Sequence, residues 1–129
     1  MAKSKPQATA EEIRASAGDL SRFEVMHNQI LVGIYLRPDD HKTAGGILLP
    51  QKTLDEDRWQ GKVGLVLKKG PLAFVDDGST NFEGQSVSDG DWVIYRVSDG
   101  FPIDVNGTHC RLLEDVHIKG RVPDPSMIY

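Results

Sequence analysis

Alternation of apolar and polar residues predicts β-strands along most of the chain. Between Gln29 and Leu36 the period is two, so one strand face is expected to carry Ile30, Val32, Ile34 and Leu36. Its other face carries Leu31, Gly33 and Tyr35. The same alternation predicts a second strand over residues 63–67, bounded by Gly61 and Gly70.

Shorter apolar runs predict the rest of an all-β fold. The further strands are expected at residues 92–97, 101–105, 108–114 and 116–122. Between two of them stands Asn106-Gly107, a dipeptide that favours the type I′ turn of a β-hairpin. Residues 70–90 form a long connection with an apolar start. Several short strands separated by turn residues are typical of a small barrel or sandwich.

The N-terminal residues 1–23 read as a polar arm with one short helix. Thr9 and Glu12 resemble a capping box, followed by Ala10, Ile13, Ala17 and Leu20 on one helix side. A helix this short is marginal in water and needs a surface to lie on. We expect the arm and the tail 123–129 to order on a neighbouring subunit or on a capsid surface. Deleting residues 1–20 should then leave the melting of the barrel nearly unchanged while weakening assembly.

Three consecutive aliphatic residues, Ile47, Leu48 and Leu49, interrupt a polar segment between the first two predicted strands. The segment follows Pro38, which cannot continue a strand ladder. Gly45 and Gly46 give its backbone large conformational freedom, so we expect the free segment to be mobile. We call residues 38–59 the docking loop. From these residues alone two interpretations stay open, a patch that binds a partner and a short core strand.

Composition excludes several classes of protein. The 129 residues fit a single compact domain, and a net charge of -4 with scattered lysines and arginines gives no footprint for nucleic acid. Cys110 is alone, which rules out an intrachain disulfide and suits the reducing cytoplasm. No run is long enough to span a bilayer, and the N-terminus lacks the apolar core of a signal peptide. We therefore expect a soluble cytoplasmic protein.

Candidate chemistry is sparse. The four histidines, His27, His41, His109 and His117, lack the spacing of a metal site, and the paired aspartates flank turns, where aspartate is common. Neither a phosphate-binding lysine loop nor a dinucleotide-binding glycine pattern is present. The aromatic residues Trp92, Tyr95 and Phe101 are expected in the barrel core or in subunit contacts. We predict no catalytic residue, metal or cofactor, and no enzyme.

Four segments together resemble the GroES co-chaperonin family, in sequence and in order. They run from His27 to Val32, from Lys42 to Leu49, from Gly61 to Val66 and from Gly90 to Tyr95. The resemblance covers about residues 25–122 and is greatest to the GroES-like proteins that bacteriophages encode. It implies a small GroES-like β-barrel at 24–122, between the arm 1–23 and the tail 123–129.

In that family the barrels form a seven-membered ring, and each mobile loop docks its aliphatic triplet on the apical domains of a chaperonin. Carried over to this chain, the triplet is Ile47, Leu48 and Leu49. The adjacent loop residues are Ala44, Gly45 and Gly46. The resemblance thus implies a homo-oligomeric co-chaperonin that caps the folding chamber.

The extensions at both ends and the 70–90 connection depart from the family pattern, and they leave a second hypothesis open. In it the chain is a virion structural protein that decorates the capsid of a phage. Arm, docking loop and tail would then grip the major capsid protein. Neither hypothesis involves nucleic acid or a membrane.

Overall fold

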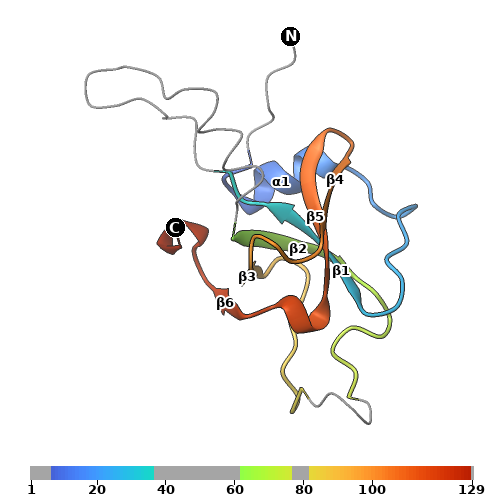
Figure 1. Ribbon diagram of the computed structural model, residues 1–129. Coiled ribbons are helices and arrows are strands. Elements are labelled where there is room, and N and C mark those ends of the chain that lie inside the picture. Colours follow the sequence, from blue (N-terminus) through green and yellow to red (C-terminus); the bar gives the residue numbers. More distant parts are fainter. Residues whose placement is uncertain (1–6, 37–61, 77–81, 129) are drawn as a thin grey trace.

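The computed structural model describes residues 7–36, 62–76 and 82–128 of the chain. These residues form a small all-β barrel with one short α-helix, as predicted (Figure 1). Six strands make one antiparallel sheet in the order β4-β5-β1-β2-β3-β6. Their bounds are β1 Gln29–Ile34, β2 Val63–Lys69, β3 Trp92–Ile94, β4 Phe101–Val105, β5 Thr108–Glu114 and β6 Gly120–Val122.

The two central strands are buried on both faces. The alternation in β1 sends Leu31 to one hydrophobic cluster, with Leu65 and Cys110, and sends Ile30 and Val32 to another. The second cluster also holds Tyr95 and Leu113 among others. A period of two therefore fixes the register of β1, because a slip by one residue would exchange its two faces.

The predicted hairpin is present between β4 and β5. Asn106 and Gly107 have φ of 52° and 81°, the positive values that a type I′ turn requires at both positions. Phe101 begins β4 and is 52% exposed, so it is not a core residue. Trp92 and Tyr95, by contrast, are buried as expected.

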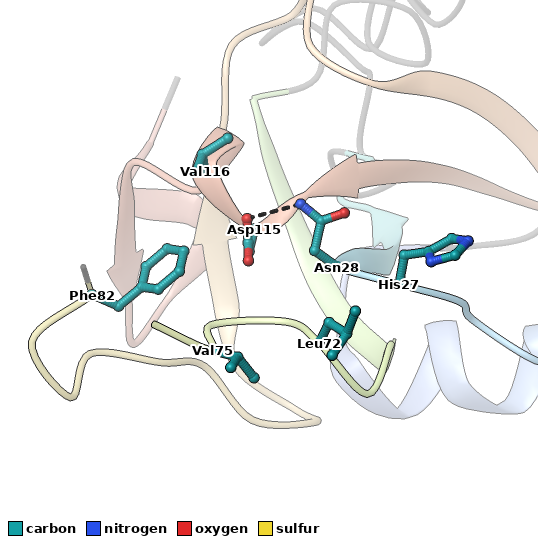
Figure 2. Close-up of a pocket in the computed structure, with 7 residues that line it drawn as sticks. All are labelled: His27, Asn28, Leu72, Val75, Phe82, Asp115 and Val116. Atoms are coloured by element: carbon teal, nitrogen blue, oxygen red, sulfur yellow. Dashed lines mark hydrogen bonds between the residues drawn. The ribbon is translucent and has the colours of Figure 1, made fainter. Parts of the chain in front are cut away.

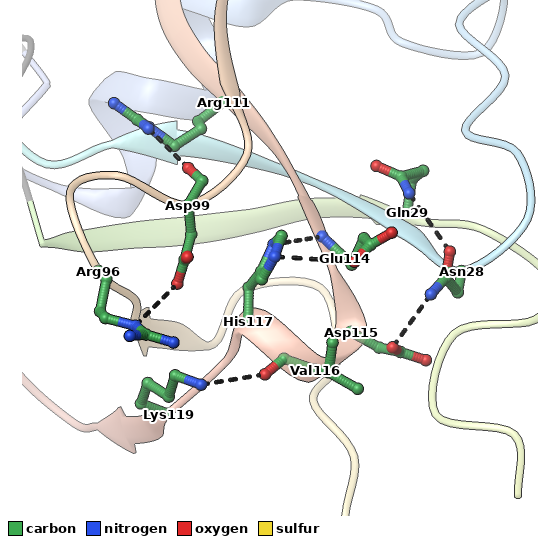
Figure 3. Close-up of polar contacts among 10 residues, drawn as sticks. All are labelled: Asn28, Gln29, Arg96, Asp99, Arg111, Glu114, Asp115, Val116, His117 and Lys119. Carbon is green, nitrogen blue, oxygen red and sulfur yellow. Dashed lines mark hydrogen bonds and ion pairs between the residues drawn. The ribbon is translucent and has the colours of Figure 1, made fainter. Parts of the chain in front are cut away.

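The predicted last strand 116–122 is wrong in its first half. Asp115–His117 is a 3-10 helix, and only Gly120–Val122 is a strand, β6. One local and one distant contact hold the turn: Glu114 N–H donates to His117 Nδ1 at 3.0 Å, and Asn28 Nδ2 donates to Asp115 Oδ1 at 3.2 Å (Figure 3). Local capping and the distant Asn28 contact together compete with strand pairing here, and alternation alone does not reveal them.

Helix α1, Ala10–Ala17, begins where the capping residues predict. Thr9 Oγ1 accepts a hydrogen bond from Glu12 N–H, and Glu12 Oε1 accepts one from Ala8 N–H. The expectation that the helix orders on a neighbouring subunit is wrong, because Ile13 and Ala17 are fully buried against the chain's own barrel. The helix is part of the core and does not present a free apolar face there.

Polar contacts fix the arm along its length. Ser16 Oγ lies 2.5 Å from Thr108 Oγ1, and Asn106 Nδ2 donates to the carbonyl of Ala17 at 2.6 Å. Figure 1 shows α1 beside the β4–β5 hairpin from which both partners come. Further along, Lys68 Nζ donates to the carbonyls of Leu20 and Phe23, at 2.7 Å each. The segment from helix to first strand is thus tied to the sheet.

Beyond β6 the chain ends in a second 3-10 helix, Pro125–Met127. The Asp124 carboxylate accepts hydrogen bonds from Ser126 N–H and from Ser126 Oγ, which lowers the pKa of Asp124. Ile128 packs on the same hydrophobic cluster as α1, whereas Met127 is 64% exposed. The described part of the tail is therefore partly anchored to the barrel.

Candidate functional site

The docking loop connects two neighbouring antiparallel strands. Ile34 of β1 pairs with Gly64 of β2, and Tyr35 N–H donates to the carbonyl of Val63 at 3.0 Å. The chain therefore leaves and re-enters the barrel on adjacent strands. The predicted site residues Ala44, Gly45, Gly46, Ile47, Leu48 and Leu49 lie outside the described residues, and their docking role stays a prediction.

The base of the docking loop is packed firmly. Ile34 and Val63 are buried, and the Tyr35 ring meets the ring of Trp92 edge-on, with 5.9 Å between centroids. Trp92 belongs to β3, so residues from β1, β2 and β3 pack together where the chain leaves β1 toward the docking loop. The described residues on either side of the docking loop are therefore part of the packed sheet.

The arm adds a contact on the β1 side of this base. Leu36 N–H donates to the backbone carbonyl of Gln7 at 2.9 Å, and Gln7 itself is buried. Sequence reasoning missed Gln7, because a single glutamine in a polar arm has no pattern around it that would predict burial. The arm thus reaches the place where the docking loop starts.

A second surface feature is a hollow of about 400 Å³ beneath the 70–76 turn (Figure 2). Its wall includes Leu72, Val75 and Val116, each about half exposed. The acid in the hollow, Asp115, is already engaged, because its carboxylate accepts from Asn28 Nδ2 and from Phe74 N–H. The carboxylate of Asp115 therefore serves the fold of this chain.

Comparison with known protein families identifies the family of this chain. The family model for the chaperonin 10 kDa subunit matches residues 22–122. The chain belongs to this family. Its six-stranded barrel has the GroES-like fold, and members of the family are co-chaperonins that partner with a GroEL-like chaperonin and assemble as homo-oligomers.

The arm precedes the part of the chain that matches the chaperonin 10 kDa family. The match begins at Arg22, whereas Gln7 and α1 lie before it. This member therefore combines the family barrel with an N-terminal helix that is packed into the barrel core. The apolar face of the arm helix serves the fold of the same chain.

The described histidine and cysteine side chains near the β4–β5 hairpin and the 3-10 turn are held within the fold. Among the described residues no group of three or more histidines, cysteines or acids could hold a metal ion. His109 Nδ1 lies 2.9 Å from Asp104 Oδ1 across the β4–β5 hairpin, and His117 belongs to the cap of the 3-10 turn. Burial raises the pKa of Cys110 to about 12, so this thiol stays protonated at neutral pH and is not a nucleophile.

The helices of the described segments are short. None of them is long and apolar enough to cross a membrane.

Proposed function

We propose that this chain is the subunit of a co-chaperonin ring that docks Ile47, Leu48 and Leu49 on the apical domains of a chaperonin in the cytoplasm. The ring then caps the folding chamber. The observation that supports this most directly is the family match over residues 22–122, which spans the docking loop and both strands that hold it.

Energetics favour several loops acting together. Burying three aliphatic side chains contributes ~1.5–3 kcal/mol each. Ordering about six loop residues costs ~1–2 kcal/mol apiece in backbone entropy, so the net for one loop is close to zero. A ring that presents several linked loops raises their effective concentration and gives useful affinity. Homo-oligomerisation, a family property, is therefore part of the mechanism.

The fixed ends of the loop make this multivalency effective. Because the strands on either side of the loop are adjacent and buried, each loop is tethered to its own barrel at both ends, and the loops of a ring stay linked. Aliphatic side chains on an extended segment suit an apolar groove, which recognises shape and apolar area rather than charge. No reaction chemistry is needed for capping.

The structure favours this function over capsid decoration. The capsid hypothesis needs an arm with a free apolar face to grip the shell. In the described part of the arm that face, Ile13 and Ala17, is buried in the chain's own core. The family match and the buried helix therefore both support the co-chaperonin.

The test is a pair of Leu→Asp variants. Leu48→Asp should abolish binding to a chaperonin in the presence of ATP while the barrel stays folded, because a carboxylate cannot enter an apolar groove without a large desolvation cost. Leu72→Asp is the matched control, since Leu72 is 54% exposed at the hollow and away from the loop base. Binding is measured by calorimetry and folding by circular dichroism.

Two outcomes would contradict the proposal. If Leu48→Asp unfolds the protein, residues 47–49 are a core strand. If Leu48→Asp binds the chaperonin as tightly as the wild type does, the triplet is not the docking element.

A further inference from the structure

Gln7 stands between the ends of β1 and β5. The β1–β5 ladder ends with the pair Gly33 and Cys110, and the next pair in this register would be Ile34 and His109. The Gln7 side chain occupies that place instead. Its Nε2 donates to the carbonyls of Ile34 and His109, at 2.8 and 2.9 Å, and its Oε1 accepts from His109 N–H at 2.8 Å.

A carboxamide is suited to this position because it carries both a donor and an acceptor, like a peptide group. Gln7 therefore continues the ladder by one step with a side chain and leaves the backbone groups it meets paired. Direct pairing of Ile34 with His109 is replaced, so the two strands are held apart where β1 ends. Gln7 is only 1% exposed, which makes each of these hydrogen bonds costly to lose.

The same residue also holds the first step beyond β1. Its backbone carbonyl accepts from Leu36 N–H at 2.9 Å, and Leu36 is the last described residue before the docking loop. On the other side, the backbone carbonyl of Lys62 accepts from Tyr95 N–H at 3.0 Å. The β1 side of the loop base is thus fixed by the arm, and the β2 side by the sheet.

We infer that Gln7 is a positioning residue for chaperonin binding: it fixes where β1 ends and in which direction the docking loop leaves the barrel. It acts without touching the chaperonin. This inference rests on the proposed function and adds to it a role for the arm. If the contact is lost, the residues near Leu36 lose their anchor to the arm, and docking must then order them as well. Every subunit of the ring adds this cost, so the loss multiplies across the ring.

The experiment compares Gln7→Ala and Gln7→Glu with Ser16→Ala. Gln7→Glu keeps the size of the side chain but has no N–H for the carbonyls of Ile34 and His109. Ser16→Ala is the structural control, because it removes a different arm contact, with Thr108, and does not touch the loop base. Wild type and Leu48→Asp are measured alongside at a temperature where every variant is folded.

Three readouts are taken: thermal unfolding, amide hydrogen exchange at Leu36 and His109, and affinity for the chaperonin with ATP. Both Gln7 variants should speed exchange at Leu36 and weaken the affinity at least several-fold. Ser16→Ala should lower thermal stability but keep wild-type affinity. If Gln7→Ala does not fold, Gln7→Asn replaces it, since asparagine keeps the amide but withdraws it by one methylene.

The outcomes separate the two claims. Wild-type affinity in a Gln7 variant that exchanges faster at Leu36 would overturn the positioning role while leaving the proposed function intact. Equal weakening by Ser16→Ala would also overturn it, because the effect would then follow stability alone. A wild-type protein that does not bind the chaperonin would overturn the proposed function, and the positioning role with it.

Discussion

Gly33 provides the space into which helix α1 packs. A Cβ at this position would overlap with Ile13 Cγ2, and Ile13 is completely buried. Helix α1 can thus approach β1 closely because Gly33 has no side chain. A glycine in the middle of a strand ordinarily weakens it, and here the close approach of a second element explains its presence.

Gly33→Ala should therefore destabilise the protein by ~1–3 kcal/mol, the usual cost of overpacking a core. The loss should be smaller when Ile13 is already alanine, because the Cγ2 atom that clashes is then absent. Urea unfolding of the two single variants and the double variant measures the coupling. Gly120→Ala is the control, since its Cβ would make an ordinary contact at 3.4 Å with Ile94. If the effects of Gly33→Ala and Ile13→Ala on the free energy of unfolding are additive, Gly33 does not provide the space that Ile13 occupies.

Cys110 makes stability depend on pH in the alkaline range. Burial raises its pKa from 9.0 to about 12 in the folded protein. Between those values the unfolded chain loses the thiol proton and the folded protein keeps it, so fewer protons are bound in the unfolded state. Stability then falls as pH rises from about 9 to about 12, and the thiol contributes no slope below that range.

Cys110→Ala should reduce this alkaline slope. The measurement is the free energy of unfolding in urea at several pH values from neutral to alkaline. Burial raises the pKa of Tyr95 as well, so part of the slope should remain above pH 10. A slope identical in the wild type and in Cys110→Ala would show that the thiol is accessible to water in the folded protein.

At the scale of elements, the sequence predicted those parts of the fold whose signals are local. The alternation in β1 and β2, the Asn106-Gly107 turn and the Thr9 cap each act within a few residues, and all are present. The failures come from contacts between distant residues. The carboxylate of Asp115 is taken by Asn28 and by the backbone of Phe74, which holds a 3-10 turn where a strand was expected.

The candidate site was predictable only in part. The docking loop is marked by its aliphatic triplet in polar surroundings, and the strands that hold it were predicted correctly. Gln7 was not predictable, because its role depends on Ile34 and His109 at the end of a ladder that forms only in the folded protein. The hollow was missed for the same reason, since its wall combines residues that are distant in sequence.

Deleting residues 1–20 should destabilise the barrel, contrary to the expectation from sequence. Loss of the buried Ile13 side chain by itself should lower the free energy of unfolding by ~1.5–3 kcal/mol. The deletion also removes the hydrogen bonds of Gln7. Thermal unfolding should show a lower midpoint than in the full chain. A shorter deletion of residues 1–6 is the control, because it keeps Gln7 and α1. Equal midpoints for the full chain and the 1–20 deletion would contradict the integration of α1 into the core.

At the scale of the whole molecule, function depends on assembly. Under the proposed function, one docking loop gains about as much from burying its triplet as it loses in entropy, so a monomer would bind a chaperonin weakly. A ring of linked barrels overcomes this through effective concentration, and closed symmetry gives one defined species instead of a range of sizes. The central claim is therefore that the chain is an oligomer that docks on a chaperonin.

Native mass spectrometry of the purified protein, alone and mixed with a chaperonin and ATP, tests that claim most directly. Alone, the 14.2 kDa chain should give a single closed oligomer at micromolar concentration. With the chaperonin and ATP, the mass should increase by that of one such oligomer for each capped chaperonin ring. A spectrum that shows only the monomer, with no complex when chaperonin and ATP are added, would contradict the account.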